Sequence, residues 1–253
     1  MINKKKPFFS IITVTKNSER FIERNIKSVL NQTIKDYEHI IIDGKSNDKT
    51  LEIINKYKKK ISYFISKKDK NMWDAINKGL KISKGQIIVI LNSDDIFYKN
   101  GLKIVKKKII NENLDCLFAA VRKKKVYHGH QLEKLYYKFN VFPSHSIGFF
   151  LKKKIYNEIG FYDKNFDYCA DYDLIYRLYK KNIKIGITSK KEVVGKFYPG
   201  GISENINYFS YIRYQAKVRI KNKQNIFYVI ILSILTILYK YFLGIIKNTK
   251  QLF

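Results

Sequence analysis

The chain has 253 residues, enough for one large α/β domain or two small ones with a buried core. Hydrophobic residues make up 45% and charged residues 28%, with only 3 Pro and 12 Gly, which excludes collagen-like, low-complexity and wholly disordered proteins. The formal net charge of +29 invites a nucleic-acid partner, but the lysines are dispersed along most of the chain and no nucleic-acid-binding motif accompanies them.

Predicted strands and helices alternate in the first half of the chain. The run 8–15 is continuous, apolar and β-branched, as in strands buried in a parallel sheet. Asn17 or Ser18 can cap the helix that follows. Further strands are predicted at 37–42, 61–66 and 86–91, with helices at 46–59 and 72–83. This β-α-β repetition predicts an α/β protein with a parallel sheet, right-handed crossovers and helices on both faces.

The second half is less regular. Strands are predicted at 114–121, 143–151, 183–187 and 193–198, a basic hairpin or loop at 123–132, and helices ending at Gly160 and covering 171–181 and 208–219. An apolar stretch follows at 226–246. We therefore expect one domain at 1–205 and a helical tail at 206–253.

Polar clusters follow three of the predicted strands, at 13–17, at Asp43 and at 92–95. In open parallel sheets, ligands bind beyond these carboxyl ends. Asp94 and Asp95 directly follow a buried strand, and adjacent carboxylates repel each other unless a cation or donors compensate. Mg²⁺ or Mn²⁺ held together with substrate phosphate oxygens would compensate them. The alternative is a solvated turn in which an aspartate caps a helix.

Several familiar site motifs are absent from the sequence. It contains no GxxxxGK[ST] and no GxGxxG, which argues against P-loop ATPases and dinucleotide dehydrogenases. It also lacks HExxH and GxSxG, the motifs of zincin proteases and α/β-hydrolases. Cys116 and Cys169 stand far apart and in no CxxC or Cys/His cluster, which argues against a disulfide framework and a zinc site. No small-residue cleavage site follows the basic start, so we expect no secretory signal.

Four motifs occur in a fixed order: SIITVTKN at 10–17, DGxSxDxT at 43–50, WDAINKG at 73–79 and NSDD at 92–95. Together they resemble glycosyltransferase family 2, and most closely its bacterial enzymes of the colanic-acid and O-antigen type. The similarity runs from about residue 7 to about residue 205. It implies the GT-A fold, which has a Rossmann-like, mostly parallel sheet, and a nucleotide-diphosphate sugar as donor.

The resemblance assigns donor-side roles. Thr13, Thr15 and Asn17 match the segment that contacts the nucleotide, and Asp43 matches the carboxylate that faces its base. The helix start that faces the sugar and phosphates is matched by Asp69, Trp73, Asp74, Asn77 and Lys78.

The resemblance also implies a divalent cofactor, Mg²⁺ or Mn²⁺. Asp94 and Asp95 match the acidic metal-binding motif, with Asp95 favoured as the direct ligand. The family motif often begins with an acid where this chain has Asn92, which puts a second direct ligand in doubt. The more usual family sequence also has Gly and Tyr where this chain has Asn71 and Trp73.

On the acceptor side, the segment ADYDL at 170–174 is similar to the one that carries the family's catalytic base, and Asp171 occupies that position. An inverting transfer needs one carboxylate to take the acceptor hydroxyl's proton as its oxygen attacks the anomeric carbon. Asp173 is the competing residue, and Asp171 could instead serve only as a helix cap. His145 aligns with a histidine near the acceptor or diphosphate, although a lone histidine is more often structural. The turn 200–203 resembles one that closes over the donor.

The tail is basic and apolar. No acidic residue follows Glu204, and the 21 residues of 226–246 contain a single charge, Lys240. Three interpretations stay open: a helix at the membrane interface, a membrane-spanning helix, and helices packed on the domain. The excess of basic residues at 217–223 over those beyond 246 favours a catalytic domain on the cytoplasmic face of a bacterial inner membrane.

These features predict an inverting, metal-dependent glycosyltransferase that moves a sugar from a nucleotide-diphosphate sugar to a glycan acceptor in bacterial surface polysaccharide synthesis, and we expect that acceptor to be lipid-linked. Expected partners are the donor, the acceptor and the membrane surface, without nucleic acid. Two alternatives remain. A basic nucleic-acid-binding module would bind with steep salt dependence and tolerate Asp95→Asn. A non-catalytic GT-A scaffold would bind nucleotide without transferring sugar.

Overall fold

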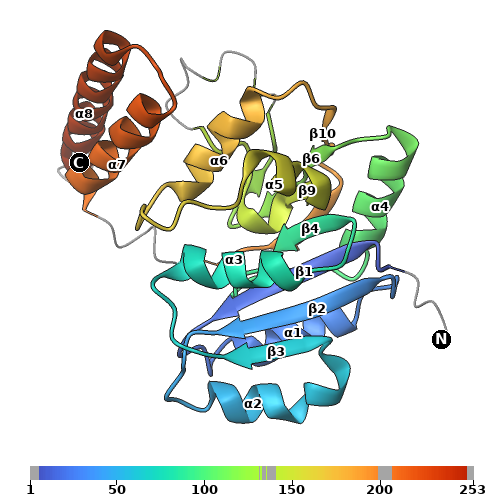
Figure 1. Cartoon of the computed structure of the whole chain (residues 1–253). Coiled ribbons are helices and arrows are strands. Elements are labelled where there is room, and N and C mark those ends of the chain that lie inside the picture. Colours follow the sequence, from blue (N-terminus) through green and yellow to red (C-terminus); the bar gives the residue numbers. More distant parts are fainter. Residues whose placement is uncertain (1–5, 131, 133–134, 136–140, 199–206, 250–253) are drawn as a thin grey trace.

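The structure is a computed structural model that describes residues 6–130, 132, 135, 141–198 and 207–249. A central seven-stranded sheet has the strand order β10-β6-β9-β4-β1-β2-β3, and a four-stranded sheet has the order β5-β11-β7-β8. The two C-terminal helices stand beside this α/β body (Figure 1). The predicted α/β architecture is therefore confirmed.

The first half of the chain forms the parallel part of the central sheet. Its strands are β1 (Phe9–Thr15), β2 (Tyr37–Asp43), β3 (Tyr63–Ser66) and β4 (Ile87–Ile90). Its helices are α1 (Ile22–Leu30), α2 (Thr50–Lys56), the short 3-10 helix η1 (Lys58–Lys60) and α3 (Met72–Ile82). In the register of β1, β2 and β3, Thr15 lies opposite Asp43, which lies opposite Ser66.

The second half of the chain completes both sheets. Its strands are β5 (Ile96–Phe97), β6 (Cys116–Phe118), β7 (Ala120–Arg122), β8 (Val126–Tyr127), β9 (Phe149–Lys152), β10 (Ile185–Ile187) and β11 (Val193–Lys196). Its helices are α4 (Gly101–Asn111), η3 (Ser146–Gly148), α5 (Lys153–Ile159), α6 (Ala170–Tyr179), α7 (Tyr208–Lys221) and α8 (Ile226–Thr249). Strand β9 runs antiparallel to both β4 and β6.

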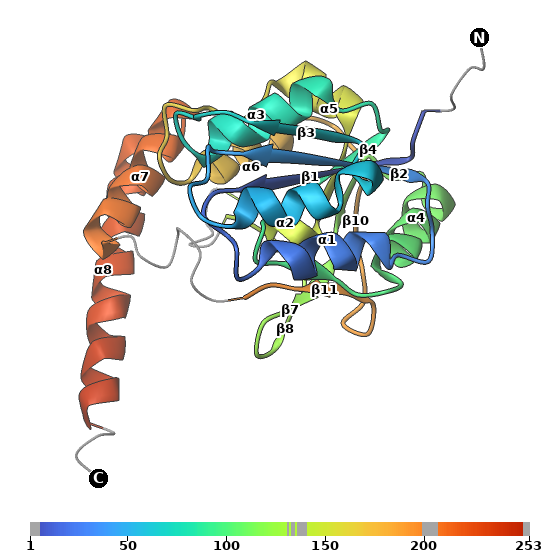
Figure 2. The same cartoon turned by 90° about the horizontal axis from the view of Figure 1, so that it is seen from below.

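Alternate side chains of the buried strands face two separate cores. Ile12, Ile40 and Ile88 pack on one face with residues of α3, α5 and α6. Ile11 and Val89 pack on the other face with residues of α1 and α4. Figure 2 shows the two helical layers on either side of the sheet. Since β1 and β4 are covered on both faces, they read as unbroken apolar runs rather than as alternating patterns.

Several predicted elements differ from those observed. The predicted strand 114–121 divides at Ala119, whose amide donates to the Gly148 carbonyl, and its halves β6 and β7 join different sheets. The predicted cap of α1 is wrong: Phe21 holds the N-cap position without a side-chain bond, because the Ser18 carbonyl accepts the amides of Phe21 and Ile22. Strand β5 and helix α4 were not predicted. The first part of the predicted strand 143–151 contains η3.

The last two helices form a hairpin in which α7 packs on α6 and α8 packs on α7. Within the described ranges, none of the helices has the length and apolar character needed to cross a membrane.

Candidate active site

The polar ends of β1, β2 and β4 meet at one edge of the central sheet. The Asp43 side chain is buried, accepts hydrogen bonds from the Ser46 amide at 3.0 Å and the Ser66 hydroxyl at 2.5 Å, and also accepts the Ser46 hydroxyl. Asn17 adopts the left-handed conformation, with φ 49°, and its amide donates to the Ser46 hydroxyl at 2.8 Å. The structure thus brings Asn17 and Asp43 together through Ser46. The buried hydroxyl of Thr15 has no partner among the described residues.

A chain of buried hydrogen bonds runs inward from this edge. Asn25, on α1, donates from its side-chain amide to the carbonyls of Asn92 at 2.7 Å and Asp95 at 2.9 Å. Its amide oxygen accepts the Thr13 hydroxyl at 3.2 Å, and the Thr13 oxygen lies 3.0 Å from Nε2 of His39. Since Thr13 donates to Asn25, it accepts from His39, which fixes the Nε2–H tautomer. Burial lowers the pKa of His39 to about 3, so this imidazole is neutral.

This chain gives Thr13 a different place from the one expected. Its side chain is fully buried and occupied by Asn25 and His39, so it supports the strand ends from inside the fold. Asn25 holds the 92–95 turn, yet no motif in the sequence marked it. Only its position on the buried face of α1 distinguishes it from an ordinary helix asparagine.

The acidic pair lies in the turn after β4. Asp95 is 1% exposed, and its Oδ1 accepts the Tyr198 amide at 3.3 Å. Its Oδ2 is buried and accepts no hydrogen bond from the described residues. Burial, and then the neighbouring Asp94 carboxylate, raises the pKa of Asp95 well above its usual range. A buried carboxylate with a bare oxygen is stable as an anion only beside a compensating cation.

His145 faces the same bare oxygen. Its Nδ1 lies 3.6 Å from Oδ2 of Asp95, which is longer than a hydrogen bond, and its ring stacks on Phe197 with centroids 4.1 Å apart. Burial, with a smaller effect of Lys123, lowers the pKa of His145 to about 4. At neutral pH this imidazole is therefore an uncharged donor or ligand and does not neutralise Asp95.

Arg24 supplies positive charge next to the acidic turn. Its guanidinium donates to the Asp94 carbonyl at 2.9 Å and lies over the rings of Tyr198 at 3.9 Å and Phe21 at 4.9 Å. The same Tyr198 offers its amide to Asp95. Arg24 could not be predicted from the sequence, because it belongs to no motif and reaches the turn only through the fold. The expected turn at 200–203 lies outside the described residues.

The five residues predicted to face the sugar and phosphates, in and just before α3, fall into two sets with different contacts. Lys78 forms ion pairs with Asp69 and, at 3.4 Å, with Asp74. Oδ2 of Asp69 is buried without a partner among the described residues and lies close to Gly44, so this cluster adjoins the Asp43 turn. Burial is the largest influence on Asp69 and raises its pKa.

The other two residues, Trp73 and Asn77, make contacts within the fold. The Trp73 indole stacks on Tyr162 with centroids 5.2 Å apart and donates to the Asp167 carbonyl at 3.1 Å. The Asn77 amide donates to the Tyr162 carbonyl at 2.7 Å and accepts its amide at 3.0 Å. Both side chains therefore connect α3 to the segment that leads into α6.

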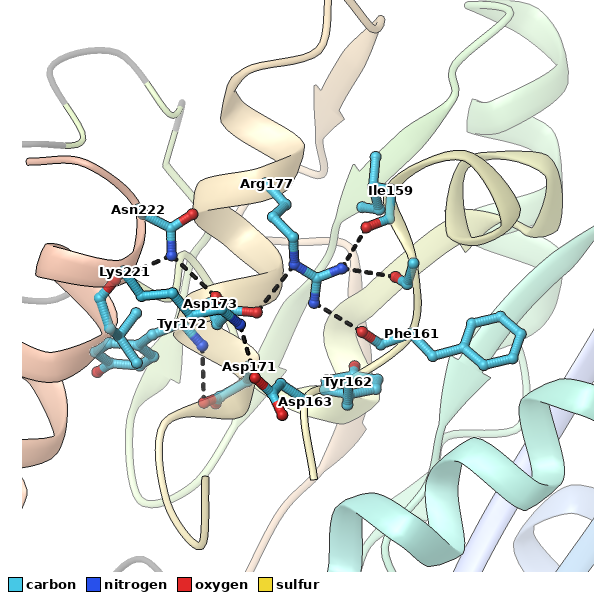
Figure 3. A network of polar contacts seen from close by, with 12 residues as sticks. Ile159, Phe161, Tyr162, Asp163, Asp171, Tyr172, Asp173, Arg177, Lys221 and Asn222 are labelled. Carbon is cyan, nitrogen blue, oxygen red and sulfur yellow. Dashed lines mark hydrogen bonds and ion pairs between the residues drawn. The ribbon is translucent and has the colours of Figure 1, made fainter. Parts of the chain in front are cut away.

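The two aspartates of α6 have different surroundings (Figure 3). Asp173 is fully buried and is bound by Arg177 at 2.9 Å, Asn222 at 2.9 Å and Lys221 at 3.0 Å. Asp171 is partly exposed, and within the described part of the chain its carboxylate accepts only the Tyr172 amide, at 3.0 Å. Burial raises the pKa of Asp171 to about 6. A base needs a free oxygen and a pKa near working pH, and Asp171 fulfils both conditions.

We predict opposite stability changes for these aspartates. The folded-state pKa of Asp171 exceeds its usual 3.8, so the fold loses stability as pH rises from about 4 to about 6. Asp171→Asn removes this loss and should raise the free energy of unfolding at pH 7.5 by up to about 3 kcal/mol. Asp173→Asn should lower it by about 3–5 kcal/mol, because Arg177 and Lys221 lose their buried partner. Urea unfolding measures the free energy of unfolding of both variants. The same change in both would contradict the view that Asp171 is an uncompensated carboxylate and Asp173 a structural one.

A second prediction concerns Asn25. Asn25→Leu leaves the carbonyls of Asn92 and Asp95 without their donor, so the free energy of unfolding should fall by about 2–4 kcal/mol. The control is Asn55→Leu, an exposed position on α2, for which we expect a change within about 0.5 kcal/mol. Urea unfolding that gives the same value for both variants would show that the turn does not depend on Asn25.

The sequence matches the model of the family described as "Glycosyl transferase family 2" over residues 10–166. The uncharacterized glycosyltransferase MJ1057 of Methanocaldococcus jannaschii is 29% identical over 247 residues, which cover 87% of this chain and 82% of that protein. The poly(ribitol-phosphate) beta-N-acetylglucosaminyltransferase TarP of Staphylococcus aureus is 43% identical over 99 residues, which cover 37% of this chain and 30% of TarP.

Solved structures show the same fold. The S. aureus TarS fragment 1–349 in complex with UDP-GlcNAc aligns with a TM-score of 0.69 and 18% identity, over 84% of this chain and 65% of that fragment. The mannosyltransferase PcManGT of Pyrobaculum calidifontis, in complex with GDP-Man and Mn²⁺, aligns with a TM-score of 0.62 and 14% identity, over 87% of this chain and 64% of that one.

These alignments confirm the expected GT-A fold, while the chain spans less than two thirds of TarP and of both solved chains. The colanic-acid and O-antigen type stays a prediction, because the matched relatives include other members of the family. The family model covers more than half of the 253 residues, and on that ground the chain belongs to glycosyltransferase family 2 and is a glycosyltransferase.

Proposed function

We propose that this glycosyltransferase is inverting and metal-dependent, and that it moves one sugar from a nucleotide-diphosphate sugar to a glycan acceptor of a bacterial surface polysaccharide. The observation that carries the proposal is the bare, buried Oδ2 of Asp95, at the sheet edge where Asp43 and Asn17 also meet. Ligands of open parallel sheets bind at this edge.

The residues at this edge fit a divalent cation. Asp95 offers its bare oxygen, Asp94 adds negative charge, and neutral His145 lies 3.6 Å from the same oxygen. The described residues contain no cluster of three or more His, Cys, Asp or Glu side chains that could hold a metal alone. Mg²⁺ and Mn²⁺ suit such a sparse site, because they accept water and substrate phosphate oxygens as the remaining ligands. A bound ion would neutralise the charge that develops on the departing diphosphate.

On the donor side, we assign the nucleotide to the Asn17–Asp43 edge and the diphosphate to the neighbourhood of Lys78 and Arg24. Asp43 has spare acceptor capacity after its three hydrogen bonds, because a carboxylate offers about four lone-pair positions. The two cations are held in place by Asp69 and by the Asp94 carbonyl. TarS and PcManGT hold UDP-GlcNAc and GDP-Man in their respective complexes, which supports a nucleotide-sugar donor of one of these kinds.

Asp171 is the proposed base. The acceptor oxygen forms its bond to the anomeric carbon as the bond from that carbon to the diphosphate oxygen breaks, and the hydroxyl proton passes to the Asp171 carboxylate. Attack from the face opposite the leaving group inverts the anomeric configuration. Asp173 cannot share this role, since its carboxylate is buried and bound by three side chains.

We propose that the acceptor is lipid-linked and that the enzyme works on the cytoplasmic face of a bacterial inner membrane. The acid-free, basic and apolar chain after Glu204 supports this location. TarP, which shares one segment with this chain, acts on poly(ribitol-phosphate) according to its name, and this supports a surface polymer as acceptor.

The metal assignment predicts a cation-dependent nucleotide response. In the presence of Mn²⁺, we expect one of UDP, GDP, TDP or CDP to bind. At about 100 times its Kd, this nucleotide should raise the free energy of unfolding by roughly 2.7 kcal/mol and Tm by several degrees. Asp95→Asn should abolish the shift, whereas Asp115→Asn, at the residue before β6, should keep it. Thermal unfolding provides the readout. A shift that survives in Asp95→Asn would rule out this ion site, and nucleotide binding without any sugar transfer would favour a non-catalytic scaffold.

The base assignment predicts a pH dependence. Because Asp171 must be ionised and its pKa is about 6, kcat/KM should fall tenfold per pH unit below that value and level off above it. Rates are measured at saturating Mn²⁺, so that protonation of Asp95 does not limit them. Asp171→Asn should lose most activity at every pH while still binding nucleotide. A profile that stays flat between pH 5 and 7 would contradict the role of Asp171.

A further inference from the structure

Helix α8 turns its less apolar side toward the protein. It meets α7 along Val229, Ser233 and Thr236, with the Tyr208 hydroxyl donating to the Thr236 carbonyl at 2.7 Å. The hydroxyls of Ser233 and Thr236 bond to carbonyls of their own helix, at 2.7 and 2.6 Å. The polar residues of this segment are therefore satisfied and lie against α7.

The opposite side of α8, which we name the outer face, is almost entirely apolar and exposed. It consists of Ile226, Phe227, Ile230, Ile231, Ile234, Leu235, Ile237, Leu238, Tyr241 and Phe242, which are 37% to 72% exposed. A helix of a water-soluble protein has the reverse arrangement, with its apolar stripe toward the core. Figure 2 shows α8 extending away from the domain, where no other described element covers it. The outer face therefore needs an apolar environment that the rest of the chain does not provide.

The charges around the hairpin indicate what that environment is. The segment 205–253 contains eight Lys or Arg residues and no Asp or Glu. Lys221 is used inside the fold by Asp163 and Asp173, whereas Arg213 and Lys217 are exposed on α7 beside Tyr214. Dimerisation with a second copy of this hairpin fits these features less well. It would bring two basic surfaces without acidic residues close together, and a single partner helix would cover only a stripe of the broad outer face. Anionic lipid satisfies both the charge and the breadth of the apolar surface.

We propose that the α7–α8 hairpin docks on an anionic lipid surface, with the outer face of α8 among the acyl chains and the basic residues of α7 at the phosphate headgroups. This inference deepens the proposed function, on which its purpose rests, because it brings the domain to a lipid-linked acceptor. The hairpin is also bound to α6, the helix that contains the proposed base Asp171. Asn222 and Lys221 bind Asp173, two residues after Asp171 on α6, so docking holds Asp171 at a set position relative to the membrane (Figure 3).

The test is flotation of the purified full chain with vesicles of phosphatidylcholine, with or without phosphatidylglycerol. We expect at least tenfold stronger binding to the anionic vesicles. The triple variant Ile230→Ser, Ile234→Ser, Leu238→Ser should reduce binding at least tenfold. Its control is Ile110→Ser, a 56% exposed apolar residue on α4, which should bind as the wild type does. The double variant Arg213→Gln, Lys217→Gln should lose roughly tenfold or more on anionic vesicles, because each cation near the surface is worth roughly a fivefold change.

Equal binding to both kinds of vesicle, or unchanged binding of the triple variant, would overturn the proposal. So would absent vesicle binding in a chain that light scattering shows to dimerise through α8. The thermal response to nucleotide and Mn²⁺ is measured on the same samples. If that response is absent while anionic vesicles still bind, the donor-site proposal fails and the docking proposal stands. If the response persists while vesicle binding is absent, the docking proposal fails and the donor-site proposal stands.

Discussion

The site depends on one unfavourable feature, the buried carboxylate of Asp95 with a bare oxygen. An anion in such a place is costly, and the neighbouring Asp94 increases the cost, as the raised pKa of Asp95 indicates. His145 is neutral there, and Arg24 reaches the turn through the Asp94 backbone carbonyl. Under the proposed metal dependence, a cation that arrives with the substrate would remove this cost only when the donor is bound. Donor binding and charge compensation are then a single event.

The fold keeps this carboxylate in place through contacts that involve no catalytic group. Asn25 binds the two carbonyls of the acidic turn, and its own orientation is fixed by Thr13 and a neutral His39. This chain connects α1, β1 and β2 to the end of β4. Near the proposed base, the network around Asp173 plays the corresponding part, since it joins α6 to α7 without using the Asp171 carboxylate.

The sequence predicted the first half of the chain well because its signals are local. Buried parallel strands read as apolar runs, and the 43–50 and 92–95 motifs follow them directly, so the sheet edge could be assigned residue by residue. The division of 114–121 could not be predicted, because the break at Ala119 depends on a distant partner, Gly148. Residue roles that depend on long-range contacts could not be predicted from the sequence for the same reason. Asn25 and Arg24 carry no motif, and Thr13 looked like a ligand contact but supports the fold from inside.

The measurement that tests the central claim most directly is the position of Mn²⁺ in crystals of the chain grown with Mn²⁺ and the preferred nucleoside diphosphate. Anomalous scattering locates the ion independently of activity. We expect a single anomalous peak within coordination distance, roughly 2.0–2.6 Å, of Oδ2 of Asp95, and the Mn²⁺ ion at this peak should also contact the diphosphate. A bound nucleotide with no peak at Asp95, or with Mn²⁺ held by other residues, would contradict it.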